Sequence, residues 1–419
     1  MYDRSKETMS PEERERYLSQ RLSEIVEYAY HNAPAVREKL DRAGVAPSQI
    51  RSLRDLERIP VTTKDELVGL QRANPPFGGF LTVPPESLQR IFFSPGPIYD
   101  PQAPTEELSG AAATAFSALG FAKGDRVMNT FSYHLVPAGL LLDEALRQLG
   151  ATVVPTGTGM TELQLQIMRD LKVTGYVGTP SFLMALIKKA EELGYDFRRD
   201  FEVRRALVSA EMLPPSLRRS FEEDYGISIS DCYGTADLGL LGYQCSHKVG
   251  MHIPEDMIVE IVDPARGKQL GPGEVGEVVV TAFNKVYPLI RFGTGDLSCY
   301  ADEPCPCGRT SYRLLGILGR VGDAVKVRGM FIHPRQMEEA ISRFPEISRF
   351  QVIIGRVGHR DEMTLRVELA QDVDREKLSQ SVDRSIQEVC RLKVDQIEFL
   401  SQGTIPEEYK KLVDERAWE

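Results

Sequence analysis

The sequence D-C-Y-G-T-A-D at Asp231–Asp237 opens the segment around which the rest of the chain is interpreted. It is followed by R-F-G-T-G-D at Arg291–Asp296 and by G-R-V-G-D-A-V-K-V-R-G at Gly319–Gly329. Each motif alone fits an ordinary turn, because glycine beside polar residues is common in loops. The information lies in the order and spacing of the three motifs.

Length and charge set the outer limits of the interpretation. A chain of 419 residues is too long for one ordinary domain, so two or three domains are expected. The net charge of −10 argues against nucleic acid or an anionic membrane as the main partner. The N-terminus is charged, without the apolar core of a secretory signal, and no run of about eighteen apolar residues occurs. We therefore expect a cytoplasmic protein.

Ser10 with Glu13 and Thr63 with Glu66 are predicted to cap helices in the first part of the chain. Helix and strand patterns alternate between residues 105 and 224. The pattern predicts helices at 110–119, 138–149, 162–171, 180–193 and 215–224, and strands at 126–131, 151–155, 175–178 and 205–209. Strands separated by helices form parallel βαβ units, which bind ligands at the carboxyl ends of the strands. The sequence thus predicts an α/β fold in the large N-terminal domain, placed at residues 1–320.

The composition changes after Gly329. Helices are predicted at 334–344 and 374–392, and strands at 350–357, 362–369 and 396–400. This pattern is typical of a small α+β domain, which we place at residues 321–419.

The three motifs in this order resemble adenylate-forming enzymes, the superfamily of acyl-CoA synthetases, peptide-synthetase adenylation domains and luciferases. The short chain and R-G-M-F-I-H-P-R-Q-M-E-E at Arg328–Glu339 are most similar to phenylacetate-CoA ligases. The resemblance runs from about Leu53 to the C-terminus. It implies that ATP activates an aryl or acyl carboxylate as an acyl adenylate, that a C-terminal lid domain rotates, and that the thiol of CoA then attacks.

The resemblance also implies roles for the turn at Tyr233–Asp237. Tyr233 would stack on adenine, Gly234 would form the turn, the hydroxyl of Thr235 would approach the phosphate, and Asp237 would hold Mg²⁺. Aspartate replaces the usual glutamate, but a shorter carboxylate can still bind Mg²⁺ through water. Asp296 matches the aspartate that accepts both ribose hydroxyls, a task that suits the two oxygens of a carboxylate.

Further nucleotide contacts follow from the same resemblance. Ser209 and Glu211 fall on the nucleotide side, Arg320 matches an arginine that contacts ribose and α-phosphate, and Lys326 matches a lysine between nucleotide and acyl group. For Arg320 and Lys326 the competing interpretation is a solvated charge in a linker. The lid would turn about Gly319–Asp323, where Gly322 replaces an acid of the family pattern.

Lys411 falls on the adenylation lysine of the family when the tail is aligned on Pro406. Its ammonium would meet the charge that develops on the carboxylate and α-phosphate. Glu407 and Glu408 stand where the family has other residues, and a plain surface lysine is the alternative interpretation.

The acyl pocket is expected beside two strand ends. Tyr133 and His134 follow the strand at 126–131, and Thr179 follows the strand at 175–178. His134 could contact a carboxylate, and a packing histidine is the competing interpretation.

The segment Ser94–Pro101 departs from the family pattern of a Ser/Thr/Gly-rich phosphate loop that ends in lysine. Three prolines lack an N–H, no lysine follows, and Asp100, Glu106 and Glu107 add negative charge. Ser94 and Gly96 are what remains of the pattern. Two interpretations stay open, an atypical phosphate loop and a proline-stiffened loop.

Three thiols and one imidazole suggest a structural zinc site. The residues are Cys245, His252, Cys305 and Cys307, in two pairs spaced C-x₆-H and C-x-C. Such a set fills a tetrahedral shell and would hold two loops together. His247 is the rival fourth ligand, and the resemblance favours His252. Unligated, reduced residues are the alternative, and Cys232, Cys299 and Cys390 fit core thiols.

Two alternatives to a CoA ligase remain on the sequence alone. One is a degenerate relative that binds a nucleotide or acyl-CoA without adenylation, and the other is an adenylyltransferase that acts on a larger cofactor. The partners expected of the ligase are a small carboxylic acid, ATP and CoA, with a homodimer left open as the assembly.

Overall fold

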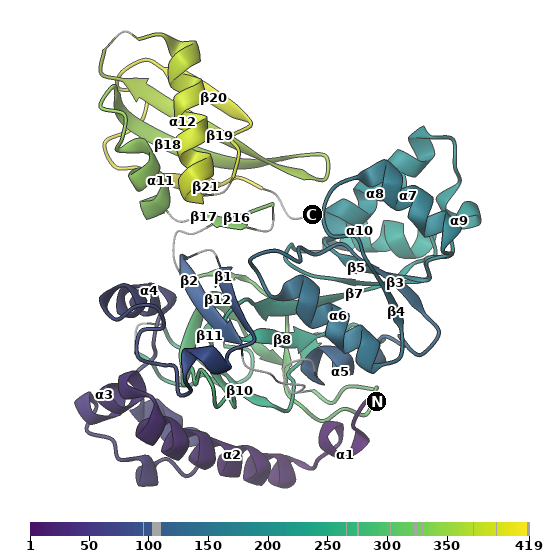
Figure 1. Cartoon of the computed structure of the whole chain (residues 1–419), viewed down its shortest axis with the longest axis vertical. Coiled ribbons are helices and arrows are strands. Elements are labelled where there is room, and N and C mark those ends of the chain that lie inside the picture. The colour runs from purple at the N-terminus through teal and green to yellow at the C-terminus, as the bar shows by residue number, and fades with distance from the viewer. Residues whose placement is uncertain are drawn as a thin grey trace. The chain divides into compact units, whose positions relative to one another are not determined.

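The structure of the chain is a computed structural model. It describes residues 1–94, 96–102, 110–264, 266–274, 276–301, 303–321, 325–328, 330–332, 334–371, 373–390 and 392–416, with the backbone alone for residues 326, 330, 331, 335 and 336. Two compact units, Met1–Val321 and Gly322–Glu419, divide the chain (Figure 1). The expected residues Glu106, Glu107, Gly322 and Asp323 lie outside the described part.

The N-terminal segment is helical. It contains α1 (Arg4–Glu7), α2 (Pro11–Asn32), α3 (Pro34–Arg42) and α4 (Lys64–Ala73), with short 3₁₀ turns at Pro47–Gln49, Leu53–Arg58 and Pro85–Ser87. The predicted cap of α2 is confirmed, because the backbone N–H of Glu13 donates to Ser10 Oγ and that of Ser10 donates to Glu13 Oε2. The predicted cap at Thr63 is confirmed for α4.

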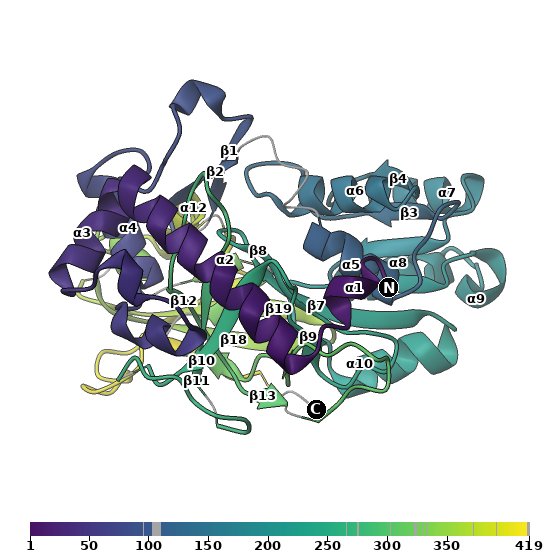
Figure 2. The same cartoon turned by 90° about the horizontal axis from the view of Figure 1, so that it is seen from below.

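The apolar face of α2 packs on an antiparallel sheet in the order β10-β11-β12-β15. These strands are β10 (Met257–Val262), β11 (Gly276–Ala282), β12 (Phe292–Ser298) and β15 (Gly319–Arg320). Figure 2 shows α2 running across this part of the molecule. Burial of such an apolar face against strands contributes the main driving force for docking the helix.

A nine-stranded sheet forms the other half of Met1–Val321, in the order β13-β14-β9-β8-β7-β6-β5-β3-β4. Five strands run parallel to one another: β3 (Arg126–Asn129), β4 (Thr152–Pro155), β5 (Gly175–Gly178), β6 (Arg205–Val208) and β7 (Ser228–Thr235). The predicted parallel βαβ units are thus confirmed. The remainder is antiparallel: β8 (Gly239–Tyr243), β9 (Met251–His252), β13 (Tyr300–Ala301) and β14 (Arg313–Leu314). Strand β7 and these four strands were not predicted.

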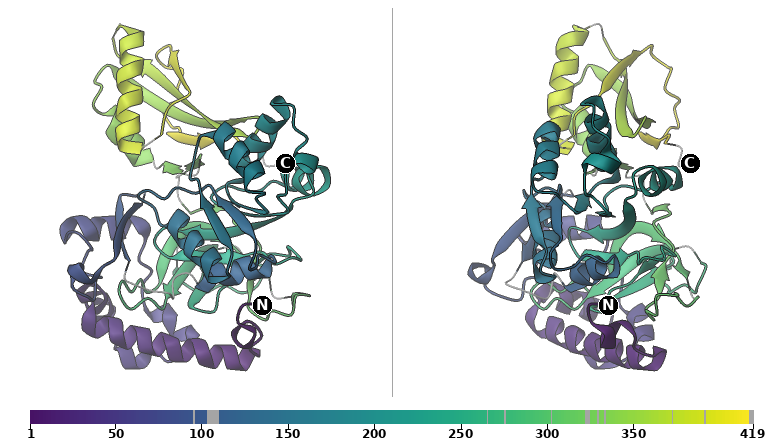
Figure 3. Two further views of the ribbon diagram at one scale, coloured as in Figure 1. Left: turned by 45° about the vertical axis from the view of Figure 1, so that its right-hand side comes forward. Right: turned by 90° about the vertical axis from the view of Figure 1, so that its right-hand side faces the viewer.

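Helices cover both faces of the parallel strands (Figures 1 and 3). The core on one face includes residues of α5 (Gly110–Ala118) and α6 (Ala138–Gln148). The core on the other face includes α7 (Thr161–Asp170), α8 (Pro180–Glu192), α9 (Phe197–Asp200) and α10 (Pro215–Arg219), which continues as a π-helical turn at Ser220–Asp224. This arrangement leaves the carboxyl ends of β3, β5, β6 and β7 along one edge of the sheet.

The segment expected to be a loop at Ser94–Pro101 is instead part of a β-hairpin. Strands β1 (Arg90–Ser94) and β2 (Ile98–Gln102) pair antiparallel, with Phe92 opposite Asp100. Gln71 of α4 holds the hairpin, since its Nε2 donates to Tyr99 O over 2.8 Å and its Oε1 accepts from Tyr99 N over 2.8 Å. A contact with a distant helix therefore decides the conformation here.

The C-terminal unit contains a sheet in the order β20-β19-β18-β21, packed against helices α11 (Pro334–Ile341) and α12 (Arg375–Cys390). The strands are β18 (Ile347–Val357), β19 (Arg360–Leu369), β20 (Gln396–Leu400) and β21 (Leu412–Asp414), and β16 (Val325–Val327) pairs with β17 (Met330–Ile332). The predicted helices and strands are confirmed, while β21 was missed. Among the described residues no helix is both long and apolar enough to span a membrane.

Candidate functional site

Asp296 is the centre of a buried group of polar side chains in Met1–Val321. Tyr233 Oη donates to its Oδ2 over 2.8 Å, and Arg320 Nε donates to its Oδ1 over 2.7 Å. Asp296 is 5% exposed. Strand pairing explains the approach of Arg320, because β12 and β15 place it directly opposite Asp296. Tyr233 and Arg320, two of the predicted nucleotide-binding residues, thus both contact a third, Asp296.

Strand β7 brings Tyr233 to this place. The ladder between β7 and β8 shifts register between Tyr233 and Gly234. A Cβ on Gly234 would lie 2.7 Å from the carbonyl oxygen of Gly239, so a side chain does not fit there. Burial, and after it the Asp296 carboxylate, raises the pKa of Tyr233 well above its usual value, so the phenol stays protonated and donates.

Asp237 pairs with a lysine that the sequence did not assign to the site. Lys64 Nζ lies 3.0 Å from Asp237 Oδ2, and the Asp237 side chain is 1% exposed. Asp237 Oδ1 and Thr235 Oγ1 are buried without a hydrogen-bond partner in the described part of the chain. Free buried carboxylate and hydroxyl oxygens suit a hard cation such as Mg²⁺, so these residues fit the expected ion.

Asp100 lies next to this pair. Burial raises the pKa of Asp100 well above its usual value, and the neighbouring Asp237 carboxylate raises it further. The acidic residue that was expected only to repel phosphate is thus part of the same buried group as Asp237.

Ser209, Glu211 and Thr179 are held by local hydrogen bonds. Ser209 Oγ donates to Cys232 O over 2.7 Å. Glu211 accepts from Ser181 Oγ over 2.9 Å. Thr179 caps α8 by accepting from the Phe182 N–H, which gives this predicted pocket residue a structural task.

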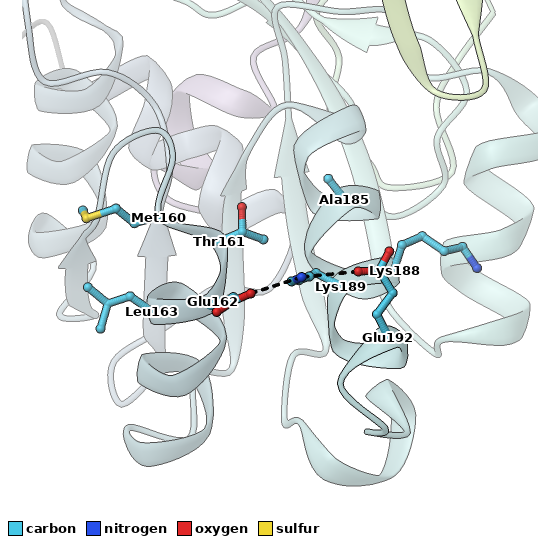
Figure 4. Close-up of a pocket in the computed structure, with 8 residues that line it drawn as sticks. All are labelled: Met160, Thr161, Glu162, Leu163, Ala185, Lys188, Lys189 and Glu192. Atoms are coloured by element: carbon cyan, nitrogen blue, oxygen red, sulfur yellow. Dashed lines mark ion pairs between the residues drawn. The ribbon is translucent and has the colours of Figure 1, made fainter.

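Tyr133 and His134 follow β3 as expected. Tyr133 Oη donates to Asp143 Oδ2 over 3.0 Å and accepts from Asn129 Nδ2 over 2.9 Å. His134 is exposed. A separate groove of about 680 Å³ lies between α7 and α8, where Glu162 and Glu192 pair with Lys189 (Figure 4). Its lining, taken from the described residues, includes none of the predicted site residues.

The two lysines expected to act on the acyl and phosphate groups belong to the C-terminal unit. Lys411 Nζ donates to Glu338 Oε1 over 2.8 Å. Lys326 lies in β16 with its backbone opposite Phe331, and its side chain is outside the described part.

The predicted zinc residues converge. The ligand atoms of Cys245, His252, Cys305 and Cys307 all lie within 4.8 Å of one another. Cys245 Sγ is 3.6 Å from Cys305 Sγ, and Cys307 Sγ is 3.4 Å from His252 Nε2. Two sulfurs bound to one tetrahedral zinc lie roughly 3.8 Å apart, so the geometry fits. His247, the rival ligand, is exposed and outside this group.

The protonation of these residues also suits a cation. Burial, followed by the charges of Arg309, Arg313 and Arg14, lowers the pKa of His252 to about 3, which keeps the imidazole neutral. His252 Nδ1 lies 3.3 Å from Ser311 Oγ, which orients the ring. Burial raises the pKa of Cys305 to about 12, so a thiolate there needs a positive partner.

Comparison with known proteins identifies the class to which the chain belongs. The family model of AMP-binding enzymes matches residues 111–284, and the model of their C-terminal domain matches residues 329–416. These matches define the class as AMP-binding enzymes.

Curated relatives narrow the class to one family. A phenylacetate-coenzyme A ligase of Thermus thermophilus is 33% identical over 388 residues, covering 90% of this chain and 86% of the relative. Another of Escherichia coli is 34% identical over 376 residues, covering 87% and 84%. The chain therefore belongs to the phenylacetate-coenzyme A ligase family of AMP-binding enzymes.

A solved structure is similar over nearly the whole length. A 2-hydroxyisobutyryl-CoA ligase in complex with 2-HIB-AMP and CoA has a TM-score of 0.93 and is 27% identical, covering 98% of this chain and 92% of the other. The predicted adenylate-forming fold is thereby confirmed.

Proposed function

We propose that the protein is an AMP-forming acid-thiol ligase that converts an aryl or acyl carboxylate to its CoA thioester. The carboxylate oxygen attacks the α-phosphorus of ATP, and pyrophosphate leaves. The thiol of CoA then attacks the acyl carbonyl, and AMP leaves. The phenylacetate-CoA ligase relatives and the ligase structure with an acyl adenylate and CoA support both steps.

The observation that carries the proposal is the fixed position of the Asp296 carboxylate. Tyr233 and Arg320 hold one oxygen each, at 2.8 Å and 2.7 Å. A carboxylate held from two sides is preorganised to accept the two ribose hydroxyls of a nucleotide, and Arg320 brings a positive charge for the α-phosphate. Preorganised charge reduces the reorganisation needed when charge develops in the transition state.

Other residues act around this centre. Lys411 and Lys326, supplied by the C-terminal unit as the lid, neutralise charge on the α-phosphate and the acyl carboxylate. Asp237 and Thr235 would hold Mg²⁺, which would supply positive charge to neutralise the phosphates and favour the departure of pyrophosphate. Ser209 and Glu211 flank the nucleotide, and Tyr133, His134 and Thr179 border the acyl group.

A panel of acids tests the proposal. Aryl and short acyl acids are incubated with ATP, Mg²⁺ and CoA, while pyrophosphate release and the mass of the thioester are followed. We expect pyrophosphate, AMP and thioester in equal amounts with at least one acid. Pyrophosphate release with an adenylated product that ignores CoA would instead favour an adenylyltransferase.

One observation favours a second candidate, a relative that binds the nucleotide without adenylation. Lys64 already occupies one oxygen of Asp237, and the hairpin β1–β2 stands where the family has its phosphate loop. Binding of AMP without pyrophosphate release from any acid would support this candidate.

We further propose that Cys245, His252, Cys305 and Cys307 bind one structural zinc ion. Four protein ligands leave no open position for water, so the ion has a structural role. It joins the segment at residues 245–252 to the segment at residues 305–307. The short distances between the ligand atoms and the neutral state of His252 support this assignment.

A further inference from the structure

A group of buried oxygens lies between the hairpin β1–β2 and the end of β7, and it extends beyond the residues already assigned to Mg²⁺. Five oxygen atoms there have no hydrogen-bond partner among the residues that the structure describes. They are Ser94 Oγ, Asp100 Oδ1, Asp100 Oδ2, Thr235 Oγ1 and Asp237 Oδ1. A buried polar atom without a partner is costly, so a set of them on three neighbouring segments calls for an explanation.

Asp100 and Ser94 are deeply buried members of this group. Asp100 is 7% exposed and Ser94 is 0% exposed. Both lie on the buried face of the hairpin, as the register of β1 and β2 requires. Ser94 lies beside the Asp100 carboxylate, and Asp237 is close enough for the two carboxylates to repel each other.

The hairpin is held firmly in this place. Gln71 binds both backbone groups of Tyr99, and its Nε2 also donates to Tyr287 Oη over 2.9 Å. Lys64 connects the hairpin turn with Asp237, because its Nζ is 3.0 Å from Asp237 Oδ2 and its Cε is 3.6 Å from the position of a Cβ on Gly96. The oxygens of Asp100 and Asp237 are therefore preorganised.

Among the described residues of this group, acidic side chains outnumber cationic ones. Among the residues that the structure describes, the two carboxyl groups share one cationic partner, the ammonium of Lys64, and that ion pair uses a single oxygen of Asp237. The five atoms without a hydrogen-bond partner that could bind a metal ion are all oxygens, two from hydroxyls and three from carboxyl groups. A donor set of this kind favours a hard divalent cation, which Mg²⁺ sites in proteins bind through one or two carboxylates together with substrate phosphates.

We propose that Asp100 is a second carboxylate ligand, with Ser94 beside it, in a divalent cation site that it shares with Asp237. The hairpin thus contributes an anionic ligand and uses the cation to attract the phosphates of ATP. Lys64 is the counter-ion of Asp237 until the cation binds. This proposal deepens the proposed function, on which its link to ATP rests, but the cation site itself is measurable without any reaction.

The test is Mn²⁺ binding to the full chain without acid or CoA, followed by the electron paramagnetic resonance of free Mn²⁺, first alone and then with a non-hydrolysable ATP analogue. We expect Asp100→Asn and Asp237→Asn each to weaken binding at least about 10-fold, the scale of losses from altering a metal site. Asp125→Asn is the control, because Asp125 is paired with Arg205 at the start of β3 and should bind like wild type.

Two further variants keep the test independent of small losses in folding. Ser94→Ala should weaken binding less than Asp100→Asn does. Lys64→Met removes the ammonium that competes for Asp237 and should bind Mn²⁺ more tightly than wild type.

Clear results would overturn the proposal. One is equal Mn²⁺ binding by wild type and Asp100→Asn, which would indicate that Asp100 holds a proton. The other is no Mn²⁺ binding by wild type under either condition. If Asp100-dependent binding is found while no acid gives a thioester, the proposed function fails and the cation site stands.

Discussion

Arg320 and Tyr233 each donate a hydrogen bond to a different carboxylate oxygen of Asp296. The two donors can therefore be tested separately. Arg320 Nε is the donor to Asp296, while Arg320 Nη2 lies 3.4 Å from Thr294 O. A lysine carries the same charge but lacks the planar set of donors that makes both contacts. The position of Asp296 therefore depends on the shape of the guanidinium as well as its charge.

Replacing Arg320 by lysine tests this dependence. Loss of one charge-assisted hydrogen bond is worth about 1.5–3 kcal/mol, so we expect kcat/KM for ATP to fall about 10-fold to 100-fold. Steady-state kinetics with varied ATP at saturating acid measures the effect. Arg126→Lys is the matched control, because Arg126 forms a surface ion pair with an N···O distance of 3.9 Å. An equal loss of kcat/KM in both variants would contradict the role of Arg320.

Lys39 gives a prediction about pH. It lies in α3, and its Nζ donates to Thr62 Oγ1 over 2.7 Å and to Ile290 O over 2.9 Å. Burial lowers the pKa of Lys39 to about 7, against about 10.4 in the unfolded chain. Between these values the unfolded chain binds the extra proton, so the free energy of unfolding rises with pH in this window.

The variant Lys39→Met removes this titration. The free energy of unfolding of wild type, relative to that of the variant, should rise by up to about 1.4 kcal/mol per pH unit between pH 7 and 10. Below pH 7 this difference should not change with pH. Urea unfolding of both proteins from pH 6 to 10 measures the difference. Parallel stability curves over that range would show that Lys39 stays charged when folded.

At the scale of elements, the cluster of Cys245, His252, Cys305 and Cys307 makes a prediction about metal content. We expect about one zinc per chain in freshly purified protein. Because the ion binds the folded state, its removal by a chelator should lower the Tm by several degrees, roughly 5 °C or more. Cys307→Ser should lose the zinc and Cys299→Ser should keep it. Elemental analysis that finds no zinc would end this assignment.

The sequence predicted the elements that depend on local signals. Ser10 and Thr63 cap their helices through backbone groups three residues away, so the pattern alone was sufficient. Strands β8, β9, β13 and β14 are short and pair with distant segments, and β21 has three residues. Such pairing is a property of the folded chain, which explains why these strands and the pairing of β1 with β2 were missed.

The same contrast holds for the candidate site. Asp296 and Arg320 are 24 residues apart in recognisable motifs, and the strand register brings them together. Lys64 and Asp237 are 173 residues apart, and the sequence around Lys64 indicated only a helix start. Residues in a motif could be predicted, whereas a partner from a distant helix could not.

At the scale of the whole molecule, the two units supply different residues to the proposed reaction. Tyr233, Asp296 and Arg320 belong to Met1–Val321, whereas Lys326 and Lys411 belong to the C-terminal unit. Binding of the nucleotide and the chemical step should therefore respond to different variants.

Lys411→Ala tests this division. We expect it to lower the rate of acyl-adenylate formation about 100-fold or more, because it removes a preorganised charge from the transition state, while the Kd of AMP changes little. Rapid-quench kinetics and calorimetry measure the two quantities. Lys410→Ala is the neighbouring control. A loss of AMP affinity in Lys411→Ala that matches its loss of rate would argue against a role in the chemical step.

The most direct test of the central claim is the acid-dependent exchange of labelled pyrophosphate into ATP, measured for wild type and for Asp296→Asn. We predict exchange only when a suitable acid is present, and a rate about 100-fold lower in Asp296→Asn, because the amide replaces the carboxylate that holds the ribose. Equal exchange by both proteins, or AMP binding by wild type without exchange for any acid, would contradict it.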